Sequence, residues 1–329
     1  MITRRALAAT GGLALAGAGV AFAQQHSAGA AITAVDVHPS DYPTVEAVRW
    51  MGEEVSRETG GRINFRLYPS GQLGSETDTV NLARFQVLDI ARVYLGAVNN
   101  MFPATQPLAL PYVFRDEAHM RSVCDGAIGR EILAAFERRG LIGLAFYDSG
   151  MRSIYNARGP IHTPDDMRGL KVRVPRADIF MEMLDAMGAN STPIPFGEVF
   201  TGLQTHLIDA AENNWATFQS TRQYEVARYW SQTDHCCAPE ALLMSKARYD
   251  ALSRADQDLF RAKATESVAI MRGLWDAKQA AARQTVLDAG VNYNEADKDA
   301  FRRAVEPMKR RWLANENIAN TIRRIDAHA

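Results

Sequence analysis

The stretch Lys171-Val172-Arg173-Val174-Pro175 is predicted to be a short strand with a charged residue near its end. Its period-two alternation places Val172 and Val174 on one face and Lys171 and Arg173 on the other. Pro175 ends the strand, because proline cannot donate to a ladder. An arginine flanked by valines is poorly hydrated and keeps its charge, so its planar fork needs an anion with two oxygens. That anion is either an internal carboxylate in a structural salt bridge or a ligand.

The segments around this strand alternate between strands and helices in two successive runs. The first run is β-α-β-α-β, with strands expected at 32–37, 63–67 and 88–93 and with helices from Pro43 to about 60 and around Leu82. A helix at 116–139 leads to the second run, which has strands at 141–147, 152–156 and 208–211, helices at 177–187 and 197–206, and a loop framed by Pro193 and Pro195. Two such runs meeting near residue 150 predict an α/β fold with two lobes and a ligand cleft between them.

The last part of the chain, residues 246–325, is predicted to be mainly helical. Ser253 has the character of a cap, and the helix after it extends to about residue 289, where it spans both lobes, unless it breaks near Gly273. We therefore expect two discontinuous lobes. Lobe I takes residues 31–150 and about 238–275, and lobe II takes residues 151–237 and about 276–329.

The N-terminus has the three parts of a signal peptide. Arg4 and Arg5 precede an Ala/Gly/Leu run at 6–20, and Ala21-Phe22-Ala23 gives the small-x-small cleavage pattern. We expect residues 1–23 to be removed and the mature protein to be exported, by either the Sec or the twin-arginine route. No later stretch reaches the roughly 18 to 20 apolar residues that a membrane helix needs, so no direct membrane insertion is expected.

Composition and motifs exclude several classes of function. The net charge of −1 gives no overall field that would attract nucleic acid or anionic lipid. The sequence has no nucleophile elbow, phosphate-binding loop, His-Glu-x-x-His or Cys-x-x-Cys, and its histidines lack metal-ligand spacing, so neither a cofactor nor a metal is expected. The three cysteines are either buried thiols or include a bridge from Cys124 to Cys236 or Cys237.

Polar side chains gather at the ends of predicted strands in the second run. Arg152 opens a strand after the Gly150 bend, Arg173 lies near the end of its own strand, and Asn213 follows another. If these strands are neighbours, two cations and a neutral donor converge on one carboxylate.

Four motifs then appear in order along the chain. They are Tyr68-Pro69-Ser70-Gly71-Gln72-Leu73-Gly74-Ser75-Glu76, the stretch 163–175 that ends in Lys171-Val172-Arg173-Val174-Pro175, Pro195-Phe196-Gly197-Glu198-Val199-Phe200, and Asp209-Ala210-Ala211-Glu212-Asn213-Asn214-Trp215. Through nearly the whole mature chain the sequence resembles the DctP-type solute-binding proteins of TRAP transporters. The resemblance implies a two-lobed periplasmic receptor, with no catalysis, that closes on an organic acid and delivers it to the membrane permease subunits. A monomer suits such a shuttle.

The same motif match implies roles for individual residues. Arg173 would clamp the ligand carboxylate, Arg152 would be the second basic residue, and Asn213 would complete the clamp. Phe196 and Glu76 fall where family members line the pocket, although Glu76 is equally suited to cap the helix after Gly74. The chain departs from the family at His206, which stands where glycine is usual and either alters the turn or faces solvent.

The remaining residues expected at the site favour a sugar acid as the ligand. These residues are His38, Arg92, Tyr94, Asn214 and Trp215. Each ligand hydroxyl needs a partner once desolvated, and an indole packs well on sugar C–H groups, although Trp215 suits helix packing equally. The Asn-Asn-Trp motif with His38 looks like the sugar-acid subgroup, so a hexuronate such as D-glucuronate or D-galacturonate is expected first, then an aldonate or a C4-dicarboxylate. The rival class is an exported sugar-acid lyase or isomerase, with Glu212 and His235 or His38 as acid and base.

Overall fold

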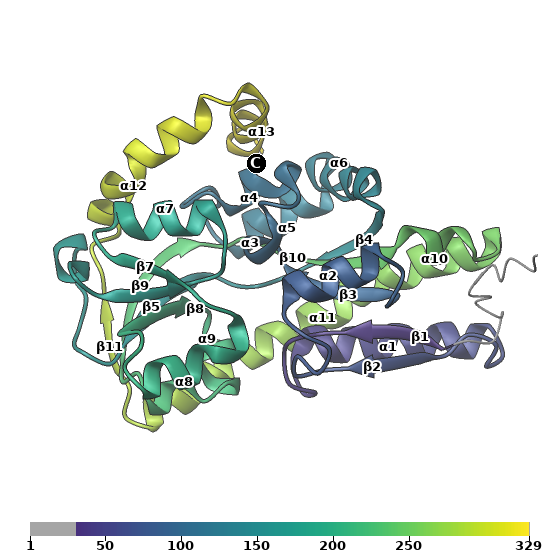
Figure 1. Cartoon of the computed structure of the whole chain (residues 1–329), viewed down its shortest axis with the longest axis horizontal. Coiled ribbons are helices and arrows are strands. Elements are labelled where there is room, and N and C mark those ends of the chain that lie inside the picture. The colour runs from purple at the N-terminus through teal and green to yellow at the C-terminus, as the bar shows by residue number, and fades with distance from the viewer. Residues whose placement is uncertain (1–30, 329) are drawn as a thin grey trace, which may run out of the picture.

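A computed structural model describes residues 31–328 and contains two mixed β-sheets, each with its own helices (Figure 1). The first sheet has the order β2-β1-β3-β10-β4 and is built from Phe65–Tyr68, Ile32–Val35, Ile90–Tyr94, Glu240–Ser245 and Leu141–Tyr147. Strands β1, β2 and β3 run parallel, and β10 is antiparallel to both β3 and β4. The helices of this lobe are α1 (Pro43–Glu58), α2 (Glu76–Arg84), α3 (Leu95–Val98), α4 (Gln106–Ala109), α5 (Glu117–Asp125), α6 (Ala127–Ala135) and α10 (Lys246–Asp250).

The second sheet has the order β11-β9-β5-β8-β6-β7 and contains the Arg173 strand. Its strands are Asn292–Glu295, Tyr229–Cys236, Arg152–Asn156, Ala210–Asn213, Lys171–Val174 and Asn190–Pro193. Strands β5, β8 and β6 are neighbours, with Ser153 opposite Asn213 and Arg173 opposite Ala211. This register brings the ends that carry Arg152, Asn213 and Arg173 to the same edge of the sheet. The helices of this lobe are α7 (Asp178–Ala186), α8 (Val199–Gln204) and α9 (Trp215–Ser220).

Helix α11 (Arg254–Asp288) ties the two lobes together. The Ser253 hydroxyl accepts the Asp256 N–H at its start, which confirms the expected cap, and the helix runs through Gly273 without a break. Its residues pack against α1 and β4 of the first lobe and against α9 of the second. Because it contacts both lobes, α11 limits how they can move relative to each other.

The C-terminal helices return across the molecule (Figure 1). Helix α12 (Lys298–Leu313) packs on α7 and β9 of the second lobe, whereas α13 (Glu316–Asp326) packs on α4 and α6 of the first. The placement of α13 differs from the expectation that everything after about residue 276 belongs to lobe II. The apolar side of α13, with Ile318 and Ile325, is buried on the first lobe.

The same helix-to-strand turn joins α2 to β3 and α8 to β8. In each turn a non-glycine residue is left-handed, Gln86 at φ 62° and His206 at φ 59°. A buried aspartate follows three residues later and accepts a backbone N–H: Asp89 from Thr33 and Asp209 from Lys171. His206 thus adopts the backbone that glycine would take, and its side chain is exposed.

Several expected elements are confirmed and others differ. The strands at 141–147, 152–156 and 171–174 have the predicted bounds. The single helix at 116–139 is wrong, because Gly126 is extended between α5 and α6. The edge strand β7, which ends at Pro193, and the strands β9 and β10 were not predicted. All three cysteines are free and buried.

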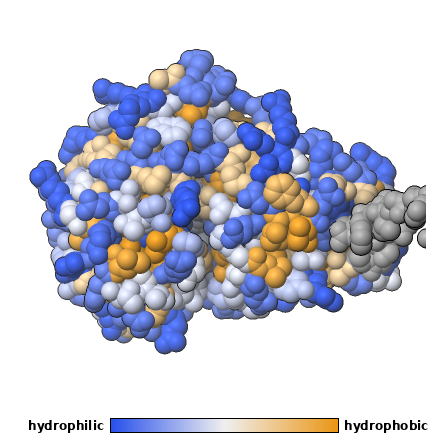
Figure 2. Space-filling view, in the orientation of Figure 1, coloured by the Kyte–Doolittle hydropathy of each residue, from blue (hydrophilic) through white to orange (hydrophobic). Residues whose placement is uncertain are grey.

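Residues 1–23, where the signal peptide is expected, lie outside the described residues. Within 31–328, no helix combines the length and apolar character needed to cross a bilayer. Figure 2 shows a face that is mostly hydrophilic, with separate apolar patches. The large apolar side chains exposed in the described part are Leu73, Phe85, Val87, Leu207 and Leu274.

Candidate functional site

A cavity lies between the two lobes, where about 330 Å³ is not filled by protein atoms and part of that space is open to solvent. The first lobe contributes Val37, His38, Glu76, Tyr94 and Glu240, and the second contributes Arg152, Arg173, Pro175, Phe196, Asn213 and Thr217. A wider hollow of about 700 Å³ adjoins it and shares Glu76, Arg173, Pro175 and Phe196. The cavity therefore has a mouth, and the edge of the second sheet predicted to bind a carboxylate faces it.

Arg173 is a buried cation that has no counter-ion in the described part of the chain. Its side chain lines the cavity, and its Nε donates to the Ile194 carbonyl at 3.0 Å. Within residues 31–328, no carboxylate lies within ion-pairing distance of its guanidinium. Burial lowers the pKa of Arg173, although an arginine stays protonated in proteins. The two terminal nitrogens are left to bind an anion, so the salt-bridge alternative for Arg173 does not hold in this structure.

Arg152 lines the same cavity but is already paired. Its Nε and Nη2 donate to the two carboxylate oxygens of Glu212 at 2.5 and 2.8 Å, and Nη2 also reaches the Glu212 carbonyl at 2.9 Å. Its guanidinium lies over the Tyr94 ring, 4.5 Å from the centroid. The expectation of two free cations is therefore corrected to one, because Glu212 uses most of the donors of Arg152.

Asn213 lies between the strands of the two arginines and is held by Arg152. Its Oδ1 accepts from Arg152 Nη1 at 2.8 Å and from the Asn214 N–H at 2.9 Å. This fixes the orientation of the amide, and its Nδ2 has no partner among the described residues. Because Asn213 lies on the strand between Arg152 and Arg173, its Nδ2 can donate to an anion held by Arg173.

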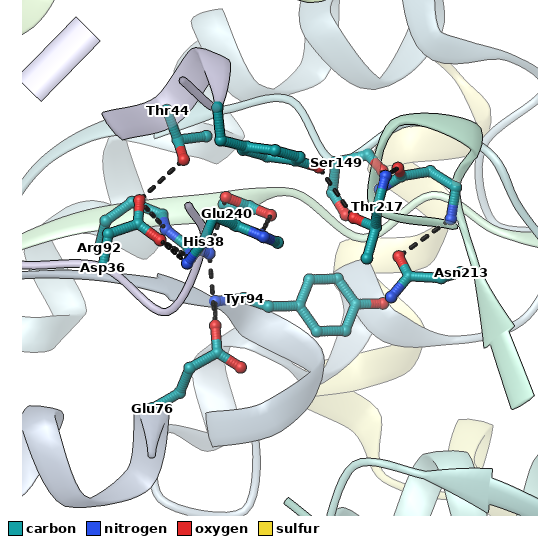
Figure 3. Close-up of polar contacts among 12 residues, drawn as sticks. Asp36, His38, Thr44, Glu76, Arg92, Tyr94, Ser149, Asn213, Thr217 and Glu240 are labelled. Atoms are coloured by element: carbon teal, nitrogen blue, oxygen red, sulfur yellow. Dashed lines mark hydrogen bonds and ion pairs between the residues drawn. The ribbon is translucent and has the colours of Figure 1, made fainter. Parts of the chain in front are cut away.

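Arg92 differs from the expectation for it, because it does not line the cavity. Its side chain is fully buried beneath the cavity and binds Asp36 through Nε at 2.8 Å and through Nη2 (Figure 3). Its Nη1 donates to Glu240 at 2.8 Å and to Glu76 at 3.3 Å. Three carboxyl groups thus share one guanidinium, which holds them in place beside the cavity.

Glu76 and Glu240 are the acidic wall of the cavity. Ser75 and Asp78 form the capping box of α2, so Glu76 is free of that task and instead accepts the Tyr94 N–H at 2.7 Å. Burial raises the pKa of Glu76 and of Glu240 to about 7 each, against the opposing effect of Arg92. Glu240 was missed from the sequence because it lies on β10, a strand that was not predicted.

His38 and Phe196 supply an aromatic surface. The His38 ring stacks on the Tyr42 ring, with 3.8 Å between the ring centroids. It meets the Phe196 ring edge to face, with 5.2 Å between the centroids. Burial, followed by the charge of Arg92, lowers the pKa of His38 to about 3, so the ring is neutral at physiological pH. Its Nδ1 is buried and has no hydrogen-bond partner in residues 31–328.

Two further expected site residues lie behind the cavity wall. Trp215 stacks on Trp230 at 3.7 Å, which matches its helix-packing alternative. Asn214 caps α9 through Thr217 N–H and donates to the Ser149 carbonyl at 2.8 Å. Neither residue lines the cavity in this structure.

The groups of the rival enzyme hypothesis are close together but poorly placed for proton transfer. His235 Nε2 lies 3.4 Å from Glu212, and neither residue lines the cavity. Although burial opposes ionisation, the charge of Arg152 and its hydrogen bonds lower the pKa of Glu212 to about 2. A carboxylate held ionised in this way has little capacity as a general acid or base.

Comparison with known proteins agrees with this architecture. The model of bacterial extracellular solute-binding protein family 7, DctP, matches residues 34–316. A solute-binding protein of Chromohalobacter salexigens is 39% identical over 274 residues, which cover 83% of this chain and 82% of that protein.

Two solved structures are similar along almost their whole length. A TRAP periplasmic solute-binding protein of Bradyrhizobium sp. BTAi1, in complex with α/β-D-galacturonate, is 45% identical with a TM-score of 0.88 and covers 90% of this chain and 99% of its own. A TRAP periplasmic solute-binding protein of Chromohalobacter salexigens with bound D-glucuronate is 36% identical with a TM-score of 0.88. The match covers 91% of this chain and 100% of that one. Both are binding proteins rather than enzymes. The chain therefore belongs to family 7 of the bacterial extracellular solute-binding proteins, the DctP family of TRAP-transporter periplasmic receptors.

Proposed function

We propose that this protein is a periplasmic receptor for a hexuronate, D-galacturonate or D-glucuronate, and that Arg173 binds the ligand carboxylate. The observation that carries the proposal is the buried Arg173 guanidinium, which lines the interlobe cavity without a carboxylate partner in the described residues. A bound carboxylate would be the direct partner that the Arg173 guanidinium lacks, and it would accept from both terminal nitrogens. Asn213 Nδ2 would add a neutral donor.

The rest of the wall suits a polyhydroxylated ring. Tyr94, Thr217, Glu76 and Glu240 offer donors and acceptors, and Phe196 and His38 offer faces for C–H groups. A simple C4-dicarboxylate would present a second carboxylate to Glu76 and Glu240, which disfavours it through repulsion. The similar structures with bound galacturonate or glucuronate, at 34–45% identity, support the same ligand class.

The transport role follows from the family. We propose that residues 1–23 direct export and that the mature monomer delivers its ligand to the permease subunits of a TRAP transporter. The lobes, proposed as 31–150 with about 238–275 and 151–237 with the segment to α12, would close on the ligand and exclude water. Closure would strengthen the Arg173 pairing by lowering the local dielectric.

Calorimetric titration tests this proposal. The wild type, Arg173→Ala and Arg173→Lys would each be titrated with D-galacturonate, D-glucuronate, D-erythronate and succinate. D-Erythronate is included because a TRAP protein of Polaromonas sp. JS666 that is 29% identical binds it. We expect tightest binding of a hexuronate. The Arg173→Ala change should weaken the binding free energy by roughly 2 to 5 kcal/mol, which raises Kd by about 30-fold to several-thousand-fold.

Lysine should restore only part of that loss, because it keeps the charge without the bidentate fork. Arg168→Ala is the matched control, since Arg168 is an exposed arginine of the same lobe paired with Asp165. Hexuronate binding that is unchanged in Arg173→Ala would overturn the clamp, and a flat response to both hexuronates would overturn the ligand class.

A further inference from the structure

The buried charges around the cavity do not balance. Three guanidinium groups line it or contact its wall, and four carboxyl groups do the same: Arg92, Arg152 and Arg173, and Asp36, Glu76, Glu212 and Glu240. All seven side chains are nine-tenths or more buried. Separating so many charges from water is costly unless they are paired. The empty cavity therefore reaches neutrality only with one proton on a carboxyl group.

The pairing pattern shows where that proton resides. Asp36 occupies two nitrogens of Arg92 and also accepts from Thr44 at 2.8 Å, and Glu212 is paired through two oxygens with Arg152. Glu76 and Glu240 instead share the single remaining nitrogen, Arg92 Nη1. These two are the weakly paired carboxyl groups of the set.

Among residues 31–328, the other cations near this carboxyl pair are already paired or belong to the ligand site. The titratable and charged groups that face the pair from neighbouring elements are Asp36, His38, Tyr42, Arg92, Arg152 and Arg173. His38 Nε2 lies 3.7 Å from Glu240 Oε1, and the ring is neutral. Arg152 is neutralised by Glu212, and Arg173 is reserved for the ligand.

We propose that Glu76 and Glu240 share one proton in the empty cavity, that they bind the hydroxyl end of the ligand, and that ligand binding draws a second proton from solvent. This inference rests on the proposed function for the ligand anion. A bound carboxylate adds a fifth negative group to three cations, so neutrality then needs two protons. Both carboxyl groups become donors as well as acceptors, which suits ligand hydroxyls that are themselves both.

The buried and unpartnered His38 Nδ1 supports the same assignment. It lies in a residue of the cavity wall, next to Glu240, and has no partner in residues 31–328. A second ligand hydroxyl can supply that partner. Arg173 would then hold the carboxylate from the second lobe, and Glu76, Glu240 and His38 would hold hydroxyl groups from the first.

Calorimetry in buffers of different ionisation enthalpy measures the proton directly. D-Galacturonate or D-glucuronate would be titrated at pH 7.5 in phosphate and in Tris. The wild type should take up about one proton per ligand, and its affinity should fall with rising pH by up to about tenfold per pH unit. The double variant Glu76→Gln with Glu240→Gln should exchange almost none. Glu198→Gln with Glu225→Gln, which neutralises two exposed carboxylates of the second lobe, should behave as the wild type.

Infrared spectroscopy of the ligand-free protein tests the shared proton without depending on which ligand binds. The infrared carbonyl stretch of a protonated carboxyl group should be present near pH 7 in the wild type and lost in the Glu76→Gln/Glu240→Gln variant. Absence of this band overturns the shared proton, whether or not a hexuronate binds. Hexuronate binding without proton uptake overturns the linkage while leaving the proposed function intact.

Discussion

Replacing Glu240 with glutamine should stabilise the ligand-free protein at neutral and alkaline pH. Glutamine keeps the shape of the side chain and an oxygen that can accept from Arg92 Nη1, now 2.8 Å from the Glu240 carboxylate. It removes one of the three carboxyl groups that share Arg92. The change therefore relieves a repulsion among these carboxyl groups, while a neutral hydrogen bond from Arg92 Nη1 replaces the ion pair that Glu240 makes with it.

The magnitude follows from the pKa of Glu240, which burial raises from an ordinary 4.5 to about 7. A carboxyl group whose pKa is raised on folding contributes stability that is fully present below 4.5 and is lost as the pH rises through about 7. Since one pKa unit corresponds to about 1.4 kcal/mol, the loss for Glu240 is at most roughly 3 kcal/mol. We expect the free energy of unfolding of Glu240→Gln to exceed that of the wild type by roughly 2 to 3 kcal/mol at pH 8 and by little at pH 5.

Urea denaturation of both proteins without ligand, at intervals from pH 5 to pH 8, measures this difference. The m-values should agree, so that the change in midpoint reports stability alone. Glu198→Gln serves as the control for removing one negative charge. Parallel stability curves for wild type and Glu240→Gln, or a variant that is less stable at pH 8, would refute the reasoning.

Three other changes test separate parts of the structure. Glu212→Gln should lower the free energy of unfolding at pH 7 by roughly 3 kcal/mol. The folded-state pKa of Glu212 is about 2 and its ordinary pKa is 4.5, so its ionised form stabilises the protein above pH 4.5 and this stability is lost as the pH falls through 2. An unchanged urea midpoint at pH 7 would contradict this. The three buried cysteines should resist a thiol reagent in the native protein and all react in urea; fewer than three reactive thiols in urea would indicate a bridge. His206→Gly should be neutral or stabilise by up to about 1 kcal/mol, because His206 is left-handed; a loss in melting temperature would show that its side chain matters.

Local sequence patterns predicted the elements whose apolar residues follow a clear helical or strand period and whose ends carry a cap or a proline. The Arg173 strand alternates and ends at proline, and the long helix has a capping serine, so both were found. The strand β10 was missed because Glu240–Ser245 is buried on both faces and consists of good helix formers. Its place between β3 and β4 depends on pairing with strands about 100 and 150 residues earlier in the chain, which no local pattern contains.

The site shows the same limit. Sequence motifs brought Arg173, Arg152 and Asn213 together correctly, because they lie at the ends of neighbouring strands. They could not show which arginine is already neutralised, since the partners of Arg92 and Arg152 lie 56 and 60 residues away. Pairing of buried charges is decided by tertiary contacts, and here it separates one free arginine from two structural ones.

A crystal structure of the protein with D-galacturonate bound tests the central claim most directly. We predict the ligand carboxylate at hydrogen-bonding distance, about 2.7 to 3.0 Å, from both terminal nitrogens of Arg173, with Asn213 Nδ2 as a further donor. Arg152 should keep its pairing with Glu212, and the ligand hydroxyls should face Glu76 and Glu240. A carboxylate bound to Arg152 or Arg92 instead, with Arg173 on a hydroxyl or on a protein carboxylate, would contradict the account.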